Sequence, residues 1–567
     1  MKEKVNVTLV CGGEVLLKSI KKGKKISELL KKDAVKLFAS SNLKAVPCAA
    51  IVNGEMHSLC YSLEEDCRCE LIDYYTTEGY RMYTRTIKFV FLMALKRVFP
   101  KGGVRIENKI GGNFKVEFVG IPKNEESIAQ IYFAMIDIVK KDFYILKEKV
   151  SYRNLRRIYH ENDMDEQAEF YSLKIHDTYS VNSCEGYYNY LYGRLLPTTG
   201  YLLNDKEVCF SLKLYEKDII LQMPRRDDIS KFFDIISSEK IDSAFYSFKE
   251  FSNNIGISSV SRLNEIALDE AKIKNVIKIF ENDQLFRIGE IVTEVVKRNN
   301  QIVFISGPSS SGKTTLSQKL EKAFKKKGIV AHAISMDDYF FEPDDSPVDE
   351  NGNKNFESVN HLDKEFFKSQ ITGLLDGKDV IIPHYNFKLG GKREFHDENR
   401  LKLEKNDVLI IEGIHALNPY VSDFMDESTF YKVYAAPLLT LAYDNFTKVS
   451  SNDTRLLRRI VRDWQTRNLS IENTFEKWAK VKEGEEKNIF PFVDKANYIF
   501  NTSLPYEICV MKLFAENLLL LVPETSKWYS EARRLYSMLQ NFRNIFTTYI
   551  PKDSIIREFI GSGCFKR

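Results

Sequence analysis

The sequence predicts an α/β protein whose C-terminal half holds a parallel sheet covered by helices, preceded by a small α+β module and a second α+β domain. From residue 301 onward, apolar strands alternate with helices, which is the pattern of a parallel sheet buried on both faces. Before it, short alternating strands are broken by glycine turns and followed by helices. A chain of 567 residues with 44% hydrophobic content is also too long for one core.

Five segments follow from this pattern. The first begins with the strand VNVTLV, the turn Gly12-Gly13, the strand EVLLKSI and the helical stretch ISELLKKDAVKLFA. The second contains the helical stretches TIKFVFLMALKRVF and IAQIYFAMIDIVKKDF around the strand KVEFVGI. The predicted boundaries are 1–65 for the small module, 66–225 for the second domain, 226–285 for a polar linker or helical connection, 286–505 for the α/β domain, and 506–567 for a C-terminal helical extension packed on it.

Composition limits the function classes. Lys plus Arg number 83 against 79 Asp plus Glu, and a net charge of +4 does not indicate a nucleic-acid or membrane surface by itself. The nine cysteines are scattered and odd in number, and Cys67 with Cys69 lacks the four ligands of a structural zinc site. The most apolar stretches, near 89–95 and 518–522, are too short to span a bilayer. We therefore expect a cytoplasmic protein with reduced thiols, no signal peptide and no membrane partner.

The strongest motif is a phosphate-binding P-loop. Gly307 and, after four residues, Gly312-Lys313-Thr314 follow the buried-type strand QIVFIS and open a helix. Backbone amides at that helix start can hold a polyphosphate, Lys313 can neutralise it, and the Thr314 hydroxyl can ligate magnesium. The alternative is a Gly-Ser loop that only opens a helix. The predicted nucleotide contacts are Gly307, Ser309, Ser310, Ser311, Gly312, Lys313, Thr314 and Thr315.

Two carboxylates follow later strands of the predicted sheet. Asp337 comes after VAHAIS, at the carboxyl edge where open α/β sheets bind ligands, and it could accept the proton of an attacking hydroxyl. Its alternative role is helix capping. Glu412 ends the strand DVLIIE and could hold magnesium directly or through water, with an ordinary loop carboxylate as the alternative.

A basic helix follows. Its arginines fall within thirteen residues, and the spacing places the first four on one helical face, where they repel one another unless anions lie opposite. Arginine binds phosphate through two parallel hydrogen bonds, so this face is predicted to contact substrate; the alternative is a solvated or acid-paired helix. The residues are Arg455, Arg458, Arg459, Arg462 and Arg467.

With these residues in hand, residues 300–505 resemble the uridine kinase and phosphoribulokinase family. The segments GPSSSGKTT, MDDYF, IIPHYNF, LIIEGIHAL and NDTRLLRRIVRD occur in the family's order. The resemblance implies a nucleoside kinase that uses ATP and Mg²⁺ to phosphorylate a small-molecule hydroxyl, most simply the 5′-hydroxyl of a uridine- or cytidine-type nucleoside. It also implies that Asp337 is the catalytic base, Tyr385 lines the nucleoside pocket, Glu412 belongs to the magnesium shell, and the arginines form a lid.

The acceptor side departs from the family pattern. Uridine kinases carry a segment similar to NFDHPDAFD with a carboxylate for the ribose, and here Asn360 stands where that Asp would fall in NFESVNHLD. The histidine expected after the pocket tyrosine is replaced within KLGGKREF. The transfer residues are therefore complete, whereas the contacts that select the acceptor differ.

The N-terminal half resembles two domains of threonyl-tRNA synthetase. Residues 1–65 resemble its β-grasp-like TGS domain, and 66–225 its second additional, editing-type domain, with the likeness carried by EGYRMYTRTIKFVFLMAL and GRLLPTTGYL. The family's two histidines, cysteine and further histidine are replaced by Arg85, Phe89, Leu191 and Leu195, so we expect no aminoacyl-tRNA editing.

A second hypothesis for the whole chain is an RNA- or ribosome-associated nucleotide-binding regulator that uses the TGS-like module. Against it, no Asn-Lys-x-Asp motif for guanine is present, and a switch needs no acceptor base. The segment IPKDSIIREFIGSGCF near the C-terminus fits none of these functions, and the sequence does not indicate an oligomeric state.

Overall fold

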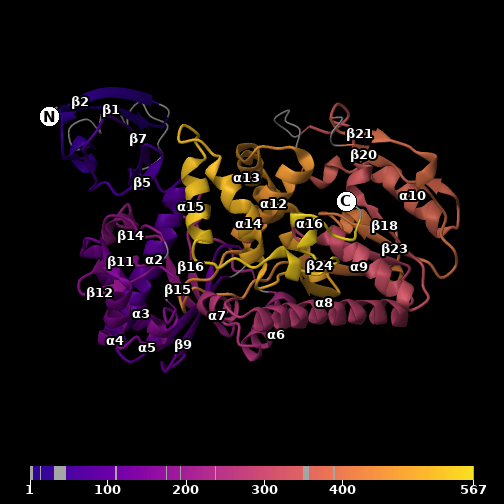
Figure 1. Ribbon diagram of the computed structural model, residues 1–567, viewed down its shortest axis with the longest axis horizontal. Coiled ribbons are helices and arrows are strands. Elements are labelled where there is room, and N and C mark those ends of the chain that lie inside the picture. The colour runs from indigo at the N-terminus through magenta and orange to yellow at the C-terminus, as the bar shows by residue number, and fades with distance from the viewer. Residues whose placement is uncertain are drawn as a thin grey trace.

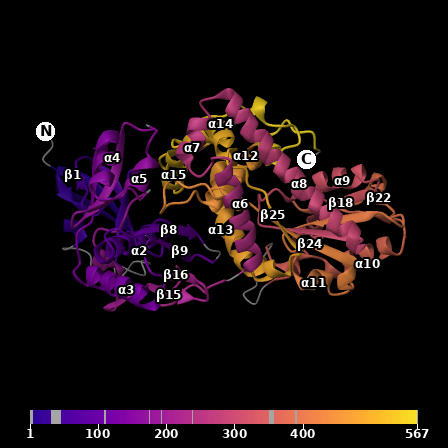
Figure 2. The same ribbon diagram turned by 90° about the horizontal axis from the view of Figure 1, so that it is seen from below.

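The computed structural model describes residues 4–12, 14–30, 46–108, 111–173, 175–191, 193–236, 238–348, 357–386 and 390–565. Residues 26–30 are helical, and the rest of the predicted helix ISELLKKDAVKLFA lies outside the described residues. Figure 1 shows an indigo sheet module, a purple second domain beneath it, and a larger magenta-to-yellow domain beside both. Figure 2 shows the same three parts from below.

The first sheet module spans residues 4–72 and is a mixed sheet of order β2-β1-β7-β4-β5. β1 pairs antiparallel with β2 and parallel with β7, and Asn53 and Gly54 form the predicted turn with φ of 48° and 82°. Because β7 lies in the middle of this sheet, the module continues to Ile72 and passes the predicted boundary at residue 65. The strands are β1 (Lys4–Cys11), β2 (Glu14–Lys21), β3 (Lys24–Lys25), β4 (Ala49–Val52), β5 (Glu55–His57), β6 (Ser62–Leu63) and β7 (Cys67–Ile72).

The second domain, residues 77–236, contains an antiparallel sheet of order β15-β16-β9-β8 against which α2 and α3 pack. A three-stranded sheet, β10-β11-β12, lies beside it with α4 and α5. The helices are α2 (Thr77–Val98), α3 (Glu125–Lys140), α4 (Tyr152–Glu161) and α5 (Asp165–Glu169). The strands are β8 (Gly103–Asn108), β9 (Phe114–Val119), β10 (Leu146–Ser151), β11 (Thr178–Cys184), β12 (Tyr187–Asn189), β13 (Leu203–Asn204), β14 (Glu207–Val208), β15 (Ser211–Tyr215) and β16 (Asp218–Gln222).

The C-terminal domain, residues 239–565, is built on a parallel sheet, as predicted, and this sheet has five strands in the order β18-β23-β17-β24-β25. Its central strand β17 is buried along its whole length, as expected for a strand covered on both faces. The strands are β17 (Ile302–Ser306), β18 (Ala331–Ser335), β19 (Val380–Ile381), β20 (His384–Asn386), β21 (Lys392–Glu394), β22 (Arg400–Leu401), β23 (Val408–Glu412), β24 (Phe430–Ala436) and β25 (Tyr498–Asn501).

The helices that cover this sheet come from segments before β17, between its strands and after β25. The helices are α6 (Glu239–Asn254), α7 (Val260–Ile266), α8 (Glu270–Arg298), α9 (Lys313–Lys326), α10 (Lys364–Leu375), α11 (Pro419–Ser422), α12 (Ser451–Arg467), α13 (Ile471–Asn488), α14 (Glu507–Leu520), α15 (Tyr529–Leu539) and α16 (Arg557–Ile560). In both views α14 and α15 lie in the middle of the molecule, between the second domain and the rest of the parallel-sheet domain.

Residues 239–285 are part of the core of the C-terminal domain rather than a linker. Phe248, Leu263 and Phe280 are buried in the same apolar cluster as β17 residues Val303 and Ile305. The polar, Asp- and Ser-rich composition marks the outward faces of α6 to α8, whereas their apolar faces are buried. The sequence suggested a linker or helical connection over 226–285, and in the structure residues 239–285 form helices that pack on the parallel sheet.

A segment of the C-terminal domain inserts into the second domain. Phe446, between β24 and α12, is buried in the apolar core that α2, α3 and β16 form. Asp444 beside it accepts a hydrogen bond from the Tyr171 hydroxyl at 3.1 Å, and Ile106 N donates to Asn445 O at 2.9 Å. The two domains are thus joined by side chains as well as by the chain itself. Within the described residues, no helix has the length and apolar character needed to cross a bilayer.

Candidate active site

The P-loop connects β17 to α9 in a conformation that its glycines permit. Gly312 has φ of 92°, and a Cβ at Gly307 would lie 2.0 Å from Ala435 O, so neither position accepts a side chain easily. Ser310 also has a positive φ, 58°. Lys313 Nζ donates to Gly307 O at 3.0 Å and so lies over the loop.

Arginines of α12 hold the outside of this loop. Arg455 Nε donates to Ser309 O at 2.9 Å, and Arg458 Nη1 donates to Ser310 O at 3.3 Å. Arg459 Nη1 donates to the Ser309 hydroxyl at 3.0 Å. These bonds hold two carbonyl groups and one hydroxyl group of the loop.

Each of these arginines has a buried carboxylate partner. Arg455 forms an ion pair with Glu485, which also accepts from Ser309 N at 3.1 Å. Arg458 forms one with Glu507, and the side chains of this pair are 0% and 1% exposed. The acid-paired alternative therefore applies to the buried part of α12, because a buried guanidinium needs a nearby anion.

Arg462 and Arg467 differ from the other three arginines of the set. Both are near Asp463, at 2.8 Å and 3.7 Å, and their side chains are 15% and 46% exposed. Both also act electrostatically on Asp337. The five arginines predicted as one substrate-binding face thus divide into three that support the P-loop and two that lie toward Asp337.

The strand order brings the predicted carboxylates to the P-loop. β18, β23 and β17 are neighbours, and Asp337 follows β18 in a turn over Met336–Tyr339, while Glu412 ends β23. The register places Glu412 opposite both Ser335 and Ile305. Asp337, Glu412 and the loop after β17 therefore lie at one edge of the sheet, as the sequence predicted from the carboxyl ends of parallel strands.

Electrostatic effects show how close these groups are. Burial raises the pKa of the Asp337 carboxyl, and the charges of Lys313, Arg467 and Arg462 act in the opposite direction. Burial raises the pKa of Glu412 to about 7, Lys313 lowers it, and the Asp337 charge raises it further. Two carboxylates with raised pKa values beside one lysine are typical of a functional cleft.

Thr314 and Glu412 are suitable ligands for magnesium. The Thr314 hydroxyl donates to Glu412 Oε1 at 2.9 Å, so a hydroxyl and a carboxylate oxygen meet at the start of α9. Mg²⁺ takes oxygen ligands and is commonly held by one or two protein groups, with water and phosphate oxygens completing its shell. The donor set fits that use. Among the described residues there is no cluster of three or more His, Cys, Asp or Glu side chains that could form an all-protein metal site.

Tyr385 and Asp338 lie next to this edge. Tyr385 is 5% exposed, its backbone N–H donates to Asp338 Oδ1 at 2.9 Å, and its hydroxyl donates to Phe341 O at 3.3 Å. Burial raises the pKa of Asp338 to about 6, against the effect of the Tyr385 amide. Tyr385 is thus held in place by the turn that carries Asp337.

Glu357 is a site residue that sequence reasoning missed. Burial raises the pKa of its carboxyl, and the charges of Arg459, Glu485, Asp337 and Lys313 all act on it, so it lies between α12 and the sheet edge that carries Asp337. Glu357 belongs to the segment NFESVNHLD, three residues before Asn360. Asn360 is exposed in the short turn Val359–His361.

Glu485 and Glu558 were also missed, because both reach the P-loop from distant segments. Glu485 lies in α13, and Glu558 in α16 accepts from Thr315 N at 3.2 Å and from Thr315 Oγ1 at 2.7 Å. Neither segment carries a local motif for phosphate or metal. The unexplained C-terminal segment therefore lies directly at the start of α9.

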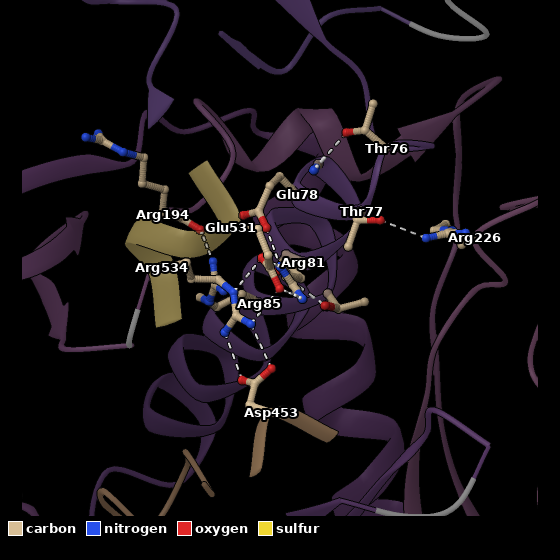
Figure 3. A network of polar contacts seen from close by, with 12 residues as sticks. Thr76, Thr77, Glu78, Arg81, Arg85, Arg194, Arg226, Asp453, Glu531 and Arg534 are labelled. Carbon is tan, nitrogen blue, oxygen red and sulfur yellow. Dashed lines mark hydrogen bonds and ion pairs between the residues drawn. The ribbon is translucent and has the colours of Figure 1, made fainter. Parts of the chain in front are cut away.

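Ionic contacts connect the site to the second domain (Figure 3). Arg81 of α2 donates to Glu531 of α15 at 2.5 and 3.1 Å, and Arg534 of α15 donates to Glu531. Arg534 also donates to Asp453 at 2.7 and 2.8 Å. Asp453 is in the first turn of α12, next to Arg455, which contacts the P-loop. The second domain thus contacts the helix that supports the loop.

In the second domain, Arg85, Phe89, Leu191 and Leu195 have structural contacts. Phe89, Leu191 and Leu195 are buried in one apolar cluster. Arg85 donates to Arg194 O at 2.5 Å, and its guanidinium lies against Gly193. The side chains at these positions form a core and a loop contact.

Comparison with known proteins addresses the C-terminal domain. Residues 302–507 match the model of the Phosphoribulokinase / Uridine kinase family. The matched range contains the P-loop, Asp337, Tyr385, Glu412 and all of α12. The match supports a P-loop kinase domain of this family over that range.

Individual relatives cover the same part of the chain. A uridine kinase of Halobacterium salinarum is 28% identical over 197 residues, which are 34% of this chain and 77% of the relative. A uridine kinase of Bacillus subtilis is 28% identical over 185 residues, 32% of this chain and 77% of the relative. A solved structure described as a possible uridine kinase from Bacillus stearothermophilus is 18% identical, covers 37% of this chain and 98% of its own, and has a TM-score of 0.25.

Proposed function

We propose that the protein transfers a phosphoryl group from ATP, with Mg²⁺, to a hydroxyl of a small molecule, and that the acceptor is the 5′-hydroxyl of a uridine- or cytidine-type nucleoside. The observation that carries the proposal is the meeting of the P-loop, Asp337 and Glu412 at one edge of the parallel sheet. The uridine kinase relatives support the choice of a nucleoside.

In this function Asp337 accepts the proton of the attacking hydroxyl. A base near a cationic group serves this purpose when its carboxylate is ionised, and Lys313, Arg467 and Arg462 favour the ionised form. Phosphoryl transfer otherwise depends on positioning and on neutralising charge. Lys313 and the backbone amides at the start of α9 hold the polyphosphate, and Arg462 and Arg467 stabilise the charge on the acceptor side.

Thr314 and Glu412 would hold Mg²⁺. The ion, when bound, neutralises charge on the transferring phosphates. Tyr385 forms a wall on the acceptor side, since its backbone amide donates to Asp338 and its hydroxyl donates to Phe341 O. Arg455, Arg458 and Arg459 position the P-loop rather than the acceptor.

The test is ATP consumption by the full chain against a panel of nucleosides and pentose phosphates. We expect stimulation by one nucleoside class, and we expect Asp337→Asn to lose about 10²–10⁴-fold in kcat while ATP affinity stays unchanged. A matched control is Asp397→Asn, an exposed carboxylate in the turn Asp397–Asn399. Absence of stimulation across the whole panel, or full activity in Asp337→Asn, would contradict the proposal.

For the N-terminal half we propose a TGS-like module followed by an editing-type domain without editing activity. Phe89, Leu191 and Leu195 support the loss, because their side chains can neither ligate metal nor transfer a proton. Deacylation of mischarged tRNA by the full chain would contradict it.

RNA contact through this half is a second candidate function. Lys147 lies on β10 and donates to Gly193 O at 3.1 Å, and burial of its ammonium group together with the charges of Arg194 and Arg85 lowers its pKa to about 7. Such gathered cations favour a phosphate-bearing partner. We expect tRNA binding that depends on salt and that Lys147→Ala weakens. The control Lys213→Ala, at an exposed position of β15, should leave binding unchanged. A flat titration at low salt would end this candidate.

A further inference from the structure

The first turn of α9 offers hydrogen-bond donors that the helix itself cannot satisfy. Gly312 is the residue before the helix, and the amides of Lys313, Thr314 and Thr315 have no acceptor within the helix. These amides carry partial positive charge and bind phosphate in P-loop proteins. A group that accepts a hydrogen bond from one of these amides therefore occupies the position of a nucleotide phosphate.

The Glu558 carboxylate accepts a hydrogen bond from one of these amides. Its Oε2 accepts from Thr315 N at 3.2 Å and from Thr315 Oγ1 at 2.7 Å. On the neighbouring residue, Glu412 accepts from the Thr314 hydroxyl at 2.9 Å. The start of α9 therefore lies between two carboxylates, one from the sheet edge and one from the C-terminal segment.

The fold fixes the backbone that carries Glu558. Ile555 and Phe559 are both 0% exposed, and Ile555 Cγ2 would lie 2.7 Å from a Cβ at Gly312. The Phe559 ring faces the buried Arg458 guanidinium at 5.0 Å, and Arg557 Nη2 donates to Ile550 O at 2.7 Å. Glu558 itself is only partly buried. Its side chain can therefore turn toward solvent without moving the segment.

A polyphosphate and this carboxylate are incompatible at the same donors. Both are anions that accept from the Thr315 amide, and like charges at hydrogen-bond distance repel strongly where solvent is partly excluded. Glu558 already acts electrostatically on Glu412, which shows that its charge reaches the predicted magnesium ligands. Nucleotide binding requires that Glu558 leave Thr315.

We propose that Glu558 is a built-in competitor for nucleotide phosphate, bound to Thr315 when the P-loop is free and displaced by rotation of its side chain when the nucleotide enters. This inference rests on the proposed kinase function and adds a control of the same site. It gives the C-terminal segment 550–561 a role: it delivers an anion to the phosphate site and lowers the intrinsic affinity of the P-loop.

The test is calorimetric titration of the full chain and of Glu558→Gln with Mg·ATP analogue, magnesium pyrophosphate and adenosine at low ionic strength. Removing one charge-assisted competitor should tighten binding of the ATP analogue and of pyrophosphate by about tenfold and leave adenosine unchanged. Asp553→Asn is the matched control, because it removes a carboxylate of the same segment that lines a different hollow, beside Glu281 and Lys319. Circular dichroism and thermal melting check that each variant folds.

Unchanged or weaker binding of the ATP analogue in Glu558→Gln would overturn the inference; weaker binding would assign Glu558 to the nucleotide contacts instead. Equal tightening of adenosine would also overturn it, because competition with phosphate cannot act on a ligand without phosphate. If neither the wild-type chain nor the variants bind ATP analogue or pyrophosphate, the kinase proposal itself fails. If the wild-type chain and Glu558→Gln bind ATP analogue and pyrophosphate with equal affinity, only the competitor role of Glu558 fails.

Discussion

Arg458 is the most deeply buried cation described in the kinase domain, and replacing it by methionine tests how the arginine helix supports the P-loop. Arg458 Nε donates to Glu507 Oε2 at 2.7 Å, and its Nη atoms donate to Ser310 O at 3.3 Å and Thr502 O at 3.1 Å. One guanidinium thus connects α12, the P-loop and the end of β25. Methionine keeps much of the volume and removes every one of these bonds.

The expected loss of unfolding free energy follows from the buried carboxylate that the substitution leaves without a partner. Arg458→Met leaves the Glu507 carboxylate, 1% exposed, without its cation, and breaking one side of a buried pair costs about 3–5 kcal/mol of unfolding free energy. Burial already raises the pKa of Glu507, and Arg458 is the principal group that opposes this. Ser310 also loses a bond that holds its positive φ of 58°, a conformation that itself costs about 1 kcal/mol or more.

The assay is denaturant unfolding followed by tryptophan fluorescence. All three tryptophans, Trp464, Trp478 and Trp528, lie in the C-terminal half, so the signal reports on the kinase domain. Arg458→Met should lose about 3–5 kcal/mol, and Arg458→Met with Glu507→Leu should recover most of this, because an apolar replacement of the whole pair leaves no buried charge.

The control is Arg462→Met on the same helix, which should cost no more than about 1 kcal/mol because its partner Asp463 keeps ion pairs with Arg459 and Arg467. A loss below about 1 kcal/mol in Arg458→Met would refute the reasoning, and so would a double variant that is less stable than the single one. In either case the guanidinium would not be the group that compensates the buried Glu507.

Two further predictions concern the sheet edge and the domain contact. The pKa of Glu412 is raised to about 7, so between about pH 4.5 and 7 the folded state holds a proton that the unfolded state has lost. Stability of the metal-free protein should therefore fall as pH rises through that window, and Glu412→Gln should flatten the pH dependence of the melting temperature. Phe446→Ala should remove about 3–5 kcal/mol by leaving a cavity in the core of the second domain, which scanning calorimetry would record as earlier melting of that domain.

Each of these has a matched control. Glu404→Gln changes an exposed carboxylate near the same strand and should leave the pH slope as it is. An equal slope in Glu412→Gln would mean that another group titrates there. Phe546→Ala removes a ring that is 62% exposed and should change stability by about 0.5 kcal/mol or less. Melting of Phe446→Ala at the wild-type temperature would show that the inserted segment does not stabilise the second domain.

Features that depend on neighbouring residues could be predicted from the sequence. The strand before Gly307, the P-loop and the helix after it follow from local apolar spacing and glycine positions, and the parallel sheet is confirmed. The nearness of Asp337 and Glu412 to the loop also followed, because the carboxyl ends of parallel strands share one edge. The roles of these site residues stay predictions until the variants are assayed.

Contacts between residues far apart in the sequence could not be predicted from it. β7 joins β1 across more than fifty residues and moves the end of the first module to Ile72, and the apolar faces of α6 to α8 find their partners in β17. The arginines of α12 divide into a group that contacts the P-loop and a group near Asp337, because Glu485 and Glu507 approach only part of this helix. Glu558 reaches Thr315 from 243 residues away. Local spacing determines which elements form and which chemical groups they carry, whereas burial and charge compensation in the packed structure determine which of those groups meet.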